Sequence, residues 1–279
     1  MATTEVATRP NQPLRPFRRR AGGAPAEGEP EWPSFKGAAK RIGTSAKGVT
    51  VYVDDALGAE AEQNAKDLLA AADDVVRQNN TIFAVDGGAV DVIVCALNGP
   101  TDGTGGADHD GCDFDVGRAI EVDAAYGNST RVIALFEAEL SECAMNKRLC
   151  GLSTGEALSR WCAAAIGANA LADFATAPQW AQSGMPNWVD HTAQSDQEAD
   201  SIGCGMAFLS WLLDSGHTLS EIAQAMVALG DGGTLAALYA QLSGKPAMQA
   251  WDSFSAAVDV LANGITSDDP FDALPHVHV

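Results

Sequence analysis

Two glutamates lie three residues apart in the apolar stretch FEAELSECAM, residues 136–145. In a helix, positions i and i+3 are neighbours, so Glu139 and Glu142 would present their carboxylates together. A third acidic residue, Glu156, follows near the start of the next helical segment. Clustered carboxylates raise each other's pKa values, and hard divalent cations prefer such oxygen ligands. The three residues are therefore candidate ligands for calcium or magnesium; the alternative is two solvated helix residues and a capping glutamate.

The five residues 138–142, AELSE, also have the spacing of the zinc-peptidase pattern HExxH. In that pattern, two histidines one helical turn apart bind the metal, and the glutamate between them polarises the bound water. Here Ala138 occupies the first histidine position, Glu139 the catalytic position and Glu142 the second histidine position. Because a methyl group cannot coordinate a metal, the sequence predicts no tightly bound zinc at this helix.

Another histidine would have to supply the missing imidazole. His109 lies in a loop rich in Asp and Gly, and His191 lies in NWVDHTAQSD, so either could reach a cleft. His217 follows a helix and is expected to interact with its C-terminus. The terminal His276 and His278 are expected to bind metal weakly at most.

The elements that would position these residues are predicted from periodicity. Strands are expected at 48–55, 81–85, 90–97 and, at a sheet edge, 118–126; a helix is expected at 58–80 and a loop at 98–115. The rest is expected to be helical, at 130–147, 153–167, 200–216, 219–230, 233–244 and 250–263. In the helix 130–147, one face is expected to be buried, made by Val132, Phe136, Leu140 and Cys143. The predicted class is α+β, a small mixed sheet followed by a mainly helical C-terminal half.

Four short motifs resemble those of a group of uncharacterised bacterial zincin-like proteins. In chain order they are AELSECAM (138–145), TGEALSR (154–160), DSIGCGMAFLSWL (200–212) and GTLAALYAQLSG (233–244). The resemblance spans roughly residues 119–262 and implies a zincin-like fold, in which an edge strand lies beside the substrate cleft and precedes the active-site helix. It implies a catalytic role for Glu139 and metal-ligand roles for Glu142 and Glu156. Ala138 and Thr154 depart from the pattern, so the motif is degenerate.

The charge of the chain is unevenly distributed. Residues 1–48 carry a net charge of +5, whereas residues 49–279 carry −25. The sequence predicts an extended basic arm at 1–48, a zincin-like domain at 49–268 with a sheet-containing half (49–147) and a helical half (148–268), and a tail at 269–279. Arm residues expected to dock on protein are Arg15, Phe17, Arg18, Arg19, Arg20, Trp32 and Phe35. Opposite charges favour a homo-oligomer linked through the arm, and the alternative is a disordered tail. The acidic body disfavours nucleic acid.

Composition limits the cellular setting. The longest apolar runs are far shorter than the ~20 residues that span a bilayer, and the N-terminus lacks the apolar region of a secretory signal. A cytoplasmic location, or one within a protein particle, is expected.

The six cysteines form no CxxC pair. Cys143 and Cys150 are close enough to bridge across a turn; otherwise the cysteines are small buried residues.

Two functions follow from these observations. The first is a non-catalytic, degenerate metallopeptidase-like protein without a cofactor, used for binding or self-assembly as a structural component. The alternative is an active metal-dependent peptidase or hydrolase with carboxylate ligands, in which Glu139 is catalytic.

Overall fold

A computed structural model describes residues 30–97, 106–115, 118–125 and 127–277. Several predicted features lie outside the described residues. They are the arm residues Arg15, Phe17, Arg18, Arg19 and Arg20, the first part of the loop 98–115, and His278.

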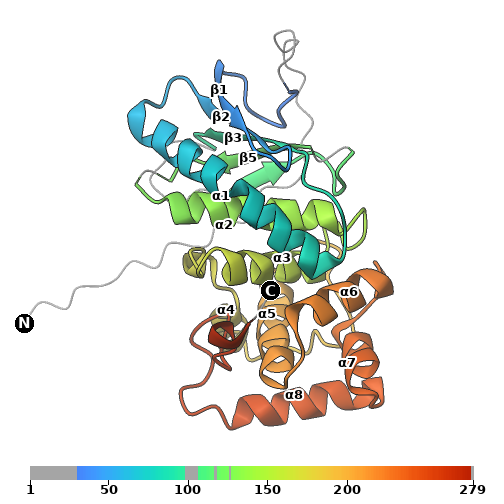
Figure 1. Ribbon diagram of the computed structural model, residues 1–279. Coiled ribbons are helices and arrows are strands. Elements are labelled where there is room, and N and C mark those ends of the chain that lie inside the picture. The colour runs from blue at the N-terminus through green and yellow to red at the C-terminus, as the bar shows by residue number, and fades with distance from the viewer. Residues whose placement is uncertain (1–29, 98–105, 116–117, 126, 278–279) are drawn as a thin grey trace, which may run out of the picture.

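A five-stranded mixed sheet forms one end of the molecule (Figure 1). Its strands are β1 (Ala39–Thr44), β2 (Thr50–Asp54), β3 (Asp91–Cys95), β4 (Ala107–His109) and β5 (Ala119–Asp123). The order across the sheet is β1-β2-β3-β5-β4; the central strands β2, β3 and β5 are parallel, and both edge strands are antiparallel to their neighbours. The helix α1 (Ala59–Phe83) provides the long crossover that the parallel pair β2–β3 requires.

Two strand predictions were wrong. The strand at 118–126 was expected at the edge, but β5 lies between β3 and β4, and the edge strand β4 lies inside the predicted loop 98–115. A three-residue strand next to glycines is too short to show alternation. The segment 81–85 was expected to be a strand, but residues 81–83 complete α1, because Ile82 and Phe83 are buried in the core of the helical half.

Helices cover one face of the sheet. Alternate strand residues, including Val51, Val92 and Ile120, form one buried cluster with Leu68 of α1 and Phe136 of α2 (Ser129–Ala144). Figure 1 shows α1 and α2 beside the sheet and the remaining helices beyond them. The core of this half therefore lies between the sheet and the helices α1 and α2.

Residues 30–38, here called the strap, cover part of the opposite face. Trp32 is buried against Tyr52, with ring centroids 5.4 Å apart, and it packs in a cluster with Ile93. The carboxylate of Glu121 accepts hydrogen bonds from the backbone N–H groups of Ser34 (2.7 Å) and Phe35 (2.6 Å). The predicted docking residues Trp32 and Phe35 therefore lie on the sheet of their own chain.

The boundary predicted at residue 48 does not coincide with the start of the folded body. Residues 39–44, which were assigned to the arm, form β1 and pair with β2. The strap before them is held by buried contacts. The ordered body therefore begins at or before residue 30, and only the arm residues before it remain candidates for an extended segment.

The helical half has its own core. Its helices are α3 (Ser153–Ile166), α4 (Ala177–Gln182), α5 (Ala199–Asp214), α6 (Leu219–Leu229), α7 (Leu235–Ser243) and α8 (Ala250–Asp259), with short 3-10 turns at Ala172–Phe174, Ala247–Gln249 and Leu274–His276. Trp161, Trp180, Phe208 and Phe254 are among its fully buried side chains. The predicted α+β class and the helical C-terminal half are confirmed.

The last described residues also pack on this half. Phe271 and Leu274 lie against its core, and the carboxylate of Asp269 accepts hydrogen bonds from the N–H groups of Ala273 (2.9 Å) and Leu274 (2.8 Å).

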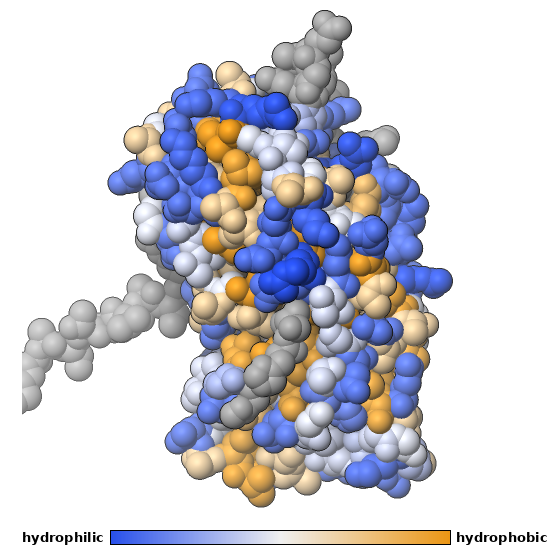
Figure 2. All heavy atoms as spheres, viewed as in Figure 1, coloured by the Kyte–Doolittle hydropathy of each residue, from blue (hydrophilic) through white to orange (hydrophobic). Residues whose placement is uncertain are grey.

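On the face shown in Figure 2, hydrophilic side chains are spread over both halves, with smaller hydrophobic patches between them. Within the described part of the chain, no helix is both long enough and apolar enough to cross a bilayer.

Candidate metal site

The helix α2 positions the two glutamates of the AELSE motif. It begins at a cap in which the Asn128 side chain accepts a hydrogen bond from the N–H of Arg131 (3.0 Å). The four residues expected to face the core, Val132, Phe136, Leu140 and Cys143, are all buried. Glu139 is 6% exposed, and the side chain of Glu142 is 20% exposed. Both carboxylates therefore lie where α2 meets its neighbours.

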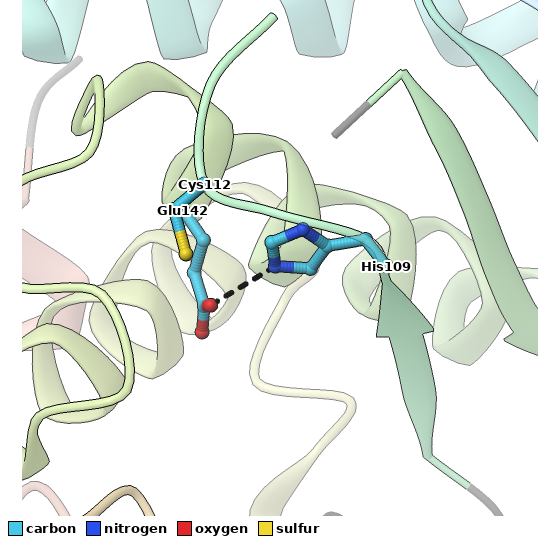
Figure 3. A group of neighbouring side chains, drawn as sticks. All are labelled: His109, Cys112 and Glu142. Atoms are coloured by element: carbon cyan, nitrogen blue, oxygen red, sulfur yellow. Dashed lines mark hydrogen bonds and ion pairs between the residues drawn. The ribbon is translucent and has the colours of Figure 1, made fainter. Parts of the chain in front are cut away.

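His109, at the end of β4, reaches both carboxylates. Its Nε2 lies 3.1 Å from Oε2 of Glu142 (Figure 3). The same nitrogen lies 3.4 Å from Oε2 of Glu139. The strand pleat explains this direction: His109 is paired with Ile120, whose side chain belongs to the core between the sheet and α2. His109 consequently faces α2, and an imidazole 33 residues away in sequence meets the helix that lacks its own histidine.

Cys112 completes a group of potential metal ligands. Its Sγ and the coordinating atoms of His109 and Glu142 all lie within 4.8 Å of one another (Figure 3). The carbonyl of Cys112 accepts a hydrogen bond from the N–H of Lys147 (2.6 Å), and Lys147 Nζ lies 3.1 Å from a carboxylate oxygen of Asp113. These contacts fix the loop after β4 to the end of α2.

Cys112 forms a disulfide with Cys150. The bridge considered from sequence, Cys143 to Cys150, is therefore wrong. Cys150 is exposed in the turn after α2 and pairs with Cys112 from the loop after β4, whereas Cys143 is buried within α2. Cys95, Cys143, Cys162 and Cys204 are buried and form no disulfide, as the alternative prediction expected.

Burial and like charges act together on Glu139. Burial is the main cause that raises its pKa well above the ordinary value, and the charges of Glu142, Glu156 and Asp108 add to it, while His109 opposes the shift. For His109, burial would lower the pKa, but hydrogen bonds with Cys143 and Glu142 and the charges of both α2 glutamates raise it well above its ordinary value. The cluster therefore favours a positive charge between its carboxylates.

Glu156 lies in the same electrostatic environment, but its carboxylate is paired elsewhere. Its Oε1 accepts a hydrogen bond from Nε of Arg160 (2.6 Å), and burial is the main cause that raises its pKa to about 7. The predicted capping role is wrong: Leu152 holds the N-cap position of α3, and Ser153 is the first helical residue. Glu156 therefore neutralises Arg160 and is not among the residues whose ligand atoms converge.

The other histidines with described side chains lie apart from this cluster. His191 forms an ion pair with Asp190 (2.5 Å), its side chain is 53% exposed, and its ring lies against Trp188. His217 lies in the turn before α6. From sequence, His109 was one of two histidines able to reach a cleft; its position on a strand facing α2 had no sequence signal, because β4 has only three residues.

No protein-family model, curated protein or solved structure matches this chain.

The donor atoms fit a borderline transition metal. Imidazole nitrogen and carboxylate oxygen are both common ligands of zinc, and the site combines them in a buried position with few competing cations. A magnesium site would be expected to offer oxygen ligands alone. The presence of His109 therefore favours zinc over the calcium or magnesium considered from the three glutamates.

Proposed function

We propose that this protein binds zinc through His109 and Glu142 on a zincin-like scaffold, with Glu139 as the adjacent proton acceptor. The observation that carries the proposal is the position of His109 Nε2, 3.1 Å from Glu142 and 3.4 Å from Glu139. His109 supplies the imidazole that Ala138 cannot. This revises the expectation that Ala138 leaves the helix without tightly bound zinc.

The order of the elements supports the zincin-like part of the proposal. An antiparallel edge strand, β4, is followed by the parallel strand β5 and then directly by α2. The resemblance implies an edge strand directly before the active-site helix; here the internal strand β5 intervenes, but the edge strand β4 still borders the cluster through His109. Within the described residues, β4 pairs only with β5, so its outer edge offers backbone groups to an extended substrate.

The proposed activity is hydrolysis of an amide or ester bond. Zinc bound there would polarise a substrate carbonyl and lower the pKa of a coordinated water. Glu139 is nearly buried, 3.4 Å from Nε2 of His109, so it would lie beside a water bound to such a metal and could accept its proton. Glu142 would hold the metal, and His109 would orient it from β4. On this proposal, His109 and Glu142 would be the ligand pair and Glu139 the base.

Zinc binding can be tested by equilibrium dialysis with elemental analysis of the full chain. Wild type is expected to retain about one zinc per chain, and His109→Gln and Glu142→Gln are expected to lose it. His191→Gln is the matched control, because His191 is exposed and lies apart from the cluster. Equal zinc retention by His109→Gln and His191→Gln would overturn the proposal, provided that circular dichroism shows both variants folded.

Glu139→Gln separates binding from catalysis. Glutamine keeps the shape of the side chain but cannot accept the proton, so this variant is expected to bind zinc and to lose hydrolysis of a casein-type mixed peptide substrate by ~100-fold or more. If wild type binds zinc but its hydrolysis equals that of Glu139→Gln, the site is structural and the protein is non-catalytic, as Ala138 first suggested.

Self-assembly is a second candidate function. The specific observation is the location of the strap, whose anchor Glu121 lies on β5 beside the acidic residues Asp108 and Asp123. Arginines, the last of which is Arg20, precede the strap in the sequence, and residues 49–279 carry a net charge of −25. Attraction between this arm and the body of a second copy would give salt-sensitive association.

A further inference from the structure

The disulfide between Cys112 and Cys150 occupies the sulfur of one of the three residues whose potential ligand atoms converge at the site. Cys112 Sγ lies within 4.8 Å of the coordinating atoms of His109 and Glu142, but a disulfide sulfur is a poor ligand compared with a thiolate. The structure therefore shows an oxidised site in which two of the three converging residues have a free ligand atom.

We propose that reduction of this disulfide releases Cys112 as a third zinc ligand, so that the redox state of the bridge controls zinc affinity. This inference rests on the proposed function, because it uses the same His109 and Glu142. Thiolate is the softest ligand of the three, and a set of sulfur, nitrogen and oxygen donors is well suited to zinc. The reduced protein would bind zinc more tightly than the oxidised protein, in which His109 and Glu142 alone would hold the metal.

The difference in exposure between the two sulfurs determines which of them a reductant attacks. Cys150 is exposed, whereas Cys112 is 7% exposed, so a dithiol reductant would attack Sγ of Cys150. The sulfur–sulfur bond breaks, and its electron pair leaves on Cys112 as a thiolate. The second thiol of the reductant then attacks the mixed disulfide, which releases Cys150 as a thiol and the reductant as a cyclic disulfide. Two electrons pass from the dithiol to the bridge, and the thiolate is formed next to His109 and Glu142.

A matched pair of variants tests this directly. Cys112→Ser and Cys150→Ser each remove the same disulfide and the same chain constraint, but only Cys150→Ser leaves a thiol at position 112. The affinities of both variants and of oxidised and dithiol-treated wild type for zinc would be measured by chelator competition. Cobalt(II) would then replace zinc, since a cobalt–thiolate bond produces a near-ultraviolet charge-transfer absorption.

We expect Cys150→Ser and reduced wild type to bind zinc at least ~10–100-fold more tightly than Cys112→Ser. Mutation of a residue that only hydrogen-bonds a metal ligand already lowers metal affinity by this factor. Only the former two should show the cobalt–thiolate absorption. Equal affinities of the two variants would overturn the inference, as would the absorption persisting in Cys112→Ser, which would assign the thiolate to Cys143. If oxidised wild type binds zinc and reduction adds nothing, the inference fails while the proposed function stands; if no form binds zinc, both fail.

Discussion

At the scale of single residues, the site depends on which side of a short strand His109 occupies. A shift of one residue in the pairing of β4 with β5 would turn His109 to the strap side and Asp108 to the α2 side. The carboxylates of Glu139 and Glu142 would then face a third acid rather than an imidazole. The observed register is therefore what brings an imidazole to an otherwise acidic cluster.

Glu137 is a second buried acid on α2, on the side that faces α3. It is fully buried, and neither carboxylate oxygen has a hydrogen-bond partner within the described residues. Burial raises its pKa well above the ordinary value near 4.5. The folded state therefore keeps a proton that the unfolded state loses, so the associated stability is complete below about pH 4.5 and is lost as pH rises toward the folded-state pKa.

Glu137→Gln should remove this dependence. We expect the variant to be more stable than wild type at pH 7 by at least ~1 kcal/mol, and to differ least from it near pH 4, as measured by urea unfolding. Glu31→Gln, at an exposed position, is the control and should change neither the stability at pH 7 nor its dependence on pH. If Glu137→Gln is less stable than wild type at pH 7, the prediction is wrong, and the carboxylate of Glu137 stabilises the folded state.

At the scale of elements, the sequence predicted what strong periodicity can reveal. The start of α2 was predicted to within one residue and its end to within three, because Val132, Phe136 and Leu140 repeat at helical spacing and are all buried. The strand β4 was missed, because three residues between glycines carry no usable alternation. Glu139 and Glu142 were therefore singled out from the sequence, whereas the proximity of His109 to them depends on the sheet register, and the pairing of Cys150 depends on the loop after β4.

The strap is the element for which the structure differs most from the sequence-based prediction. Trp32 was expected to dock an arm, but it fills the sheet face away from the helices and is 6% exposed. Trp32→Ala should therefore destabilise the monomer by about 3 kcal/mol, since it removes a large buried side chain. Phe35→Ala, at a partly buried position, should cost less. Thermal unfolding would measure both; an unchanged melting temperature for Trp32→Ala would contradict an integral strap.

At the scale of the whole molecule, charge is divided between a basic N-terminal segment and an acidic body. Deletion of residues 2–29 should leave the body folded, whereas deletion of residues 2–40 should destabilise it by removing the strap and the start of β1. If the arm links copies, the shorter deletion and raised salt should both reduce the mass measured by light scattering. Identical masses for full-length and 2–29-deleted protein at every salt concentration would end the assembly hypothesis.

The central claim is that zinc binds between β4 and α2, and the most direct measurement is anomalous X-ray diffraction at the zinc edge. Crystals of the full chain would be grown with one equivalent of zinc, with and without a dithiol. The account predicts a dominant anomalous peak at the ~2.0–2.2 Å that separates zinc from His109 Nε2 and from a carboxylate oxygen of Glu142. The absence of a peak there in both crystals, or zinc found only at His191 or at the C-terminal histidines, would contradict it.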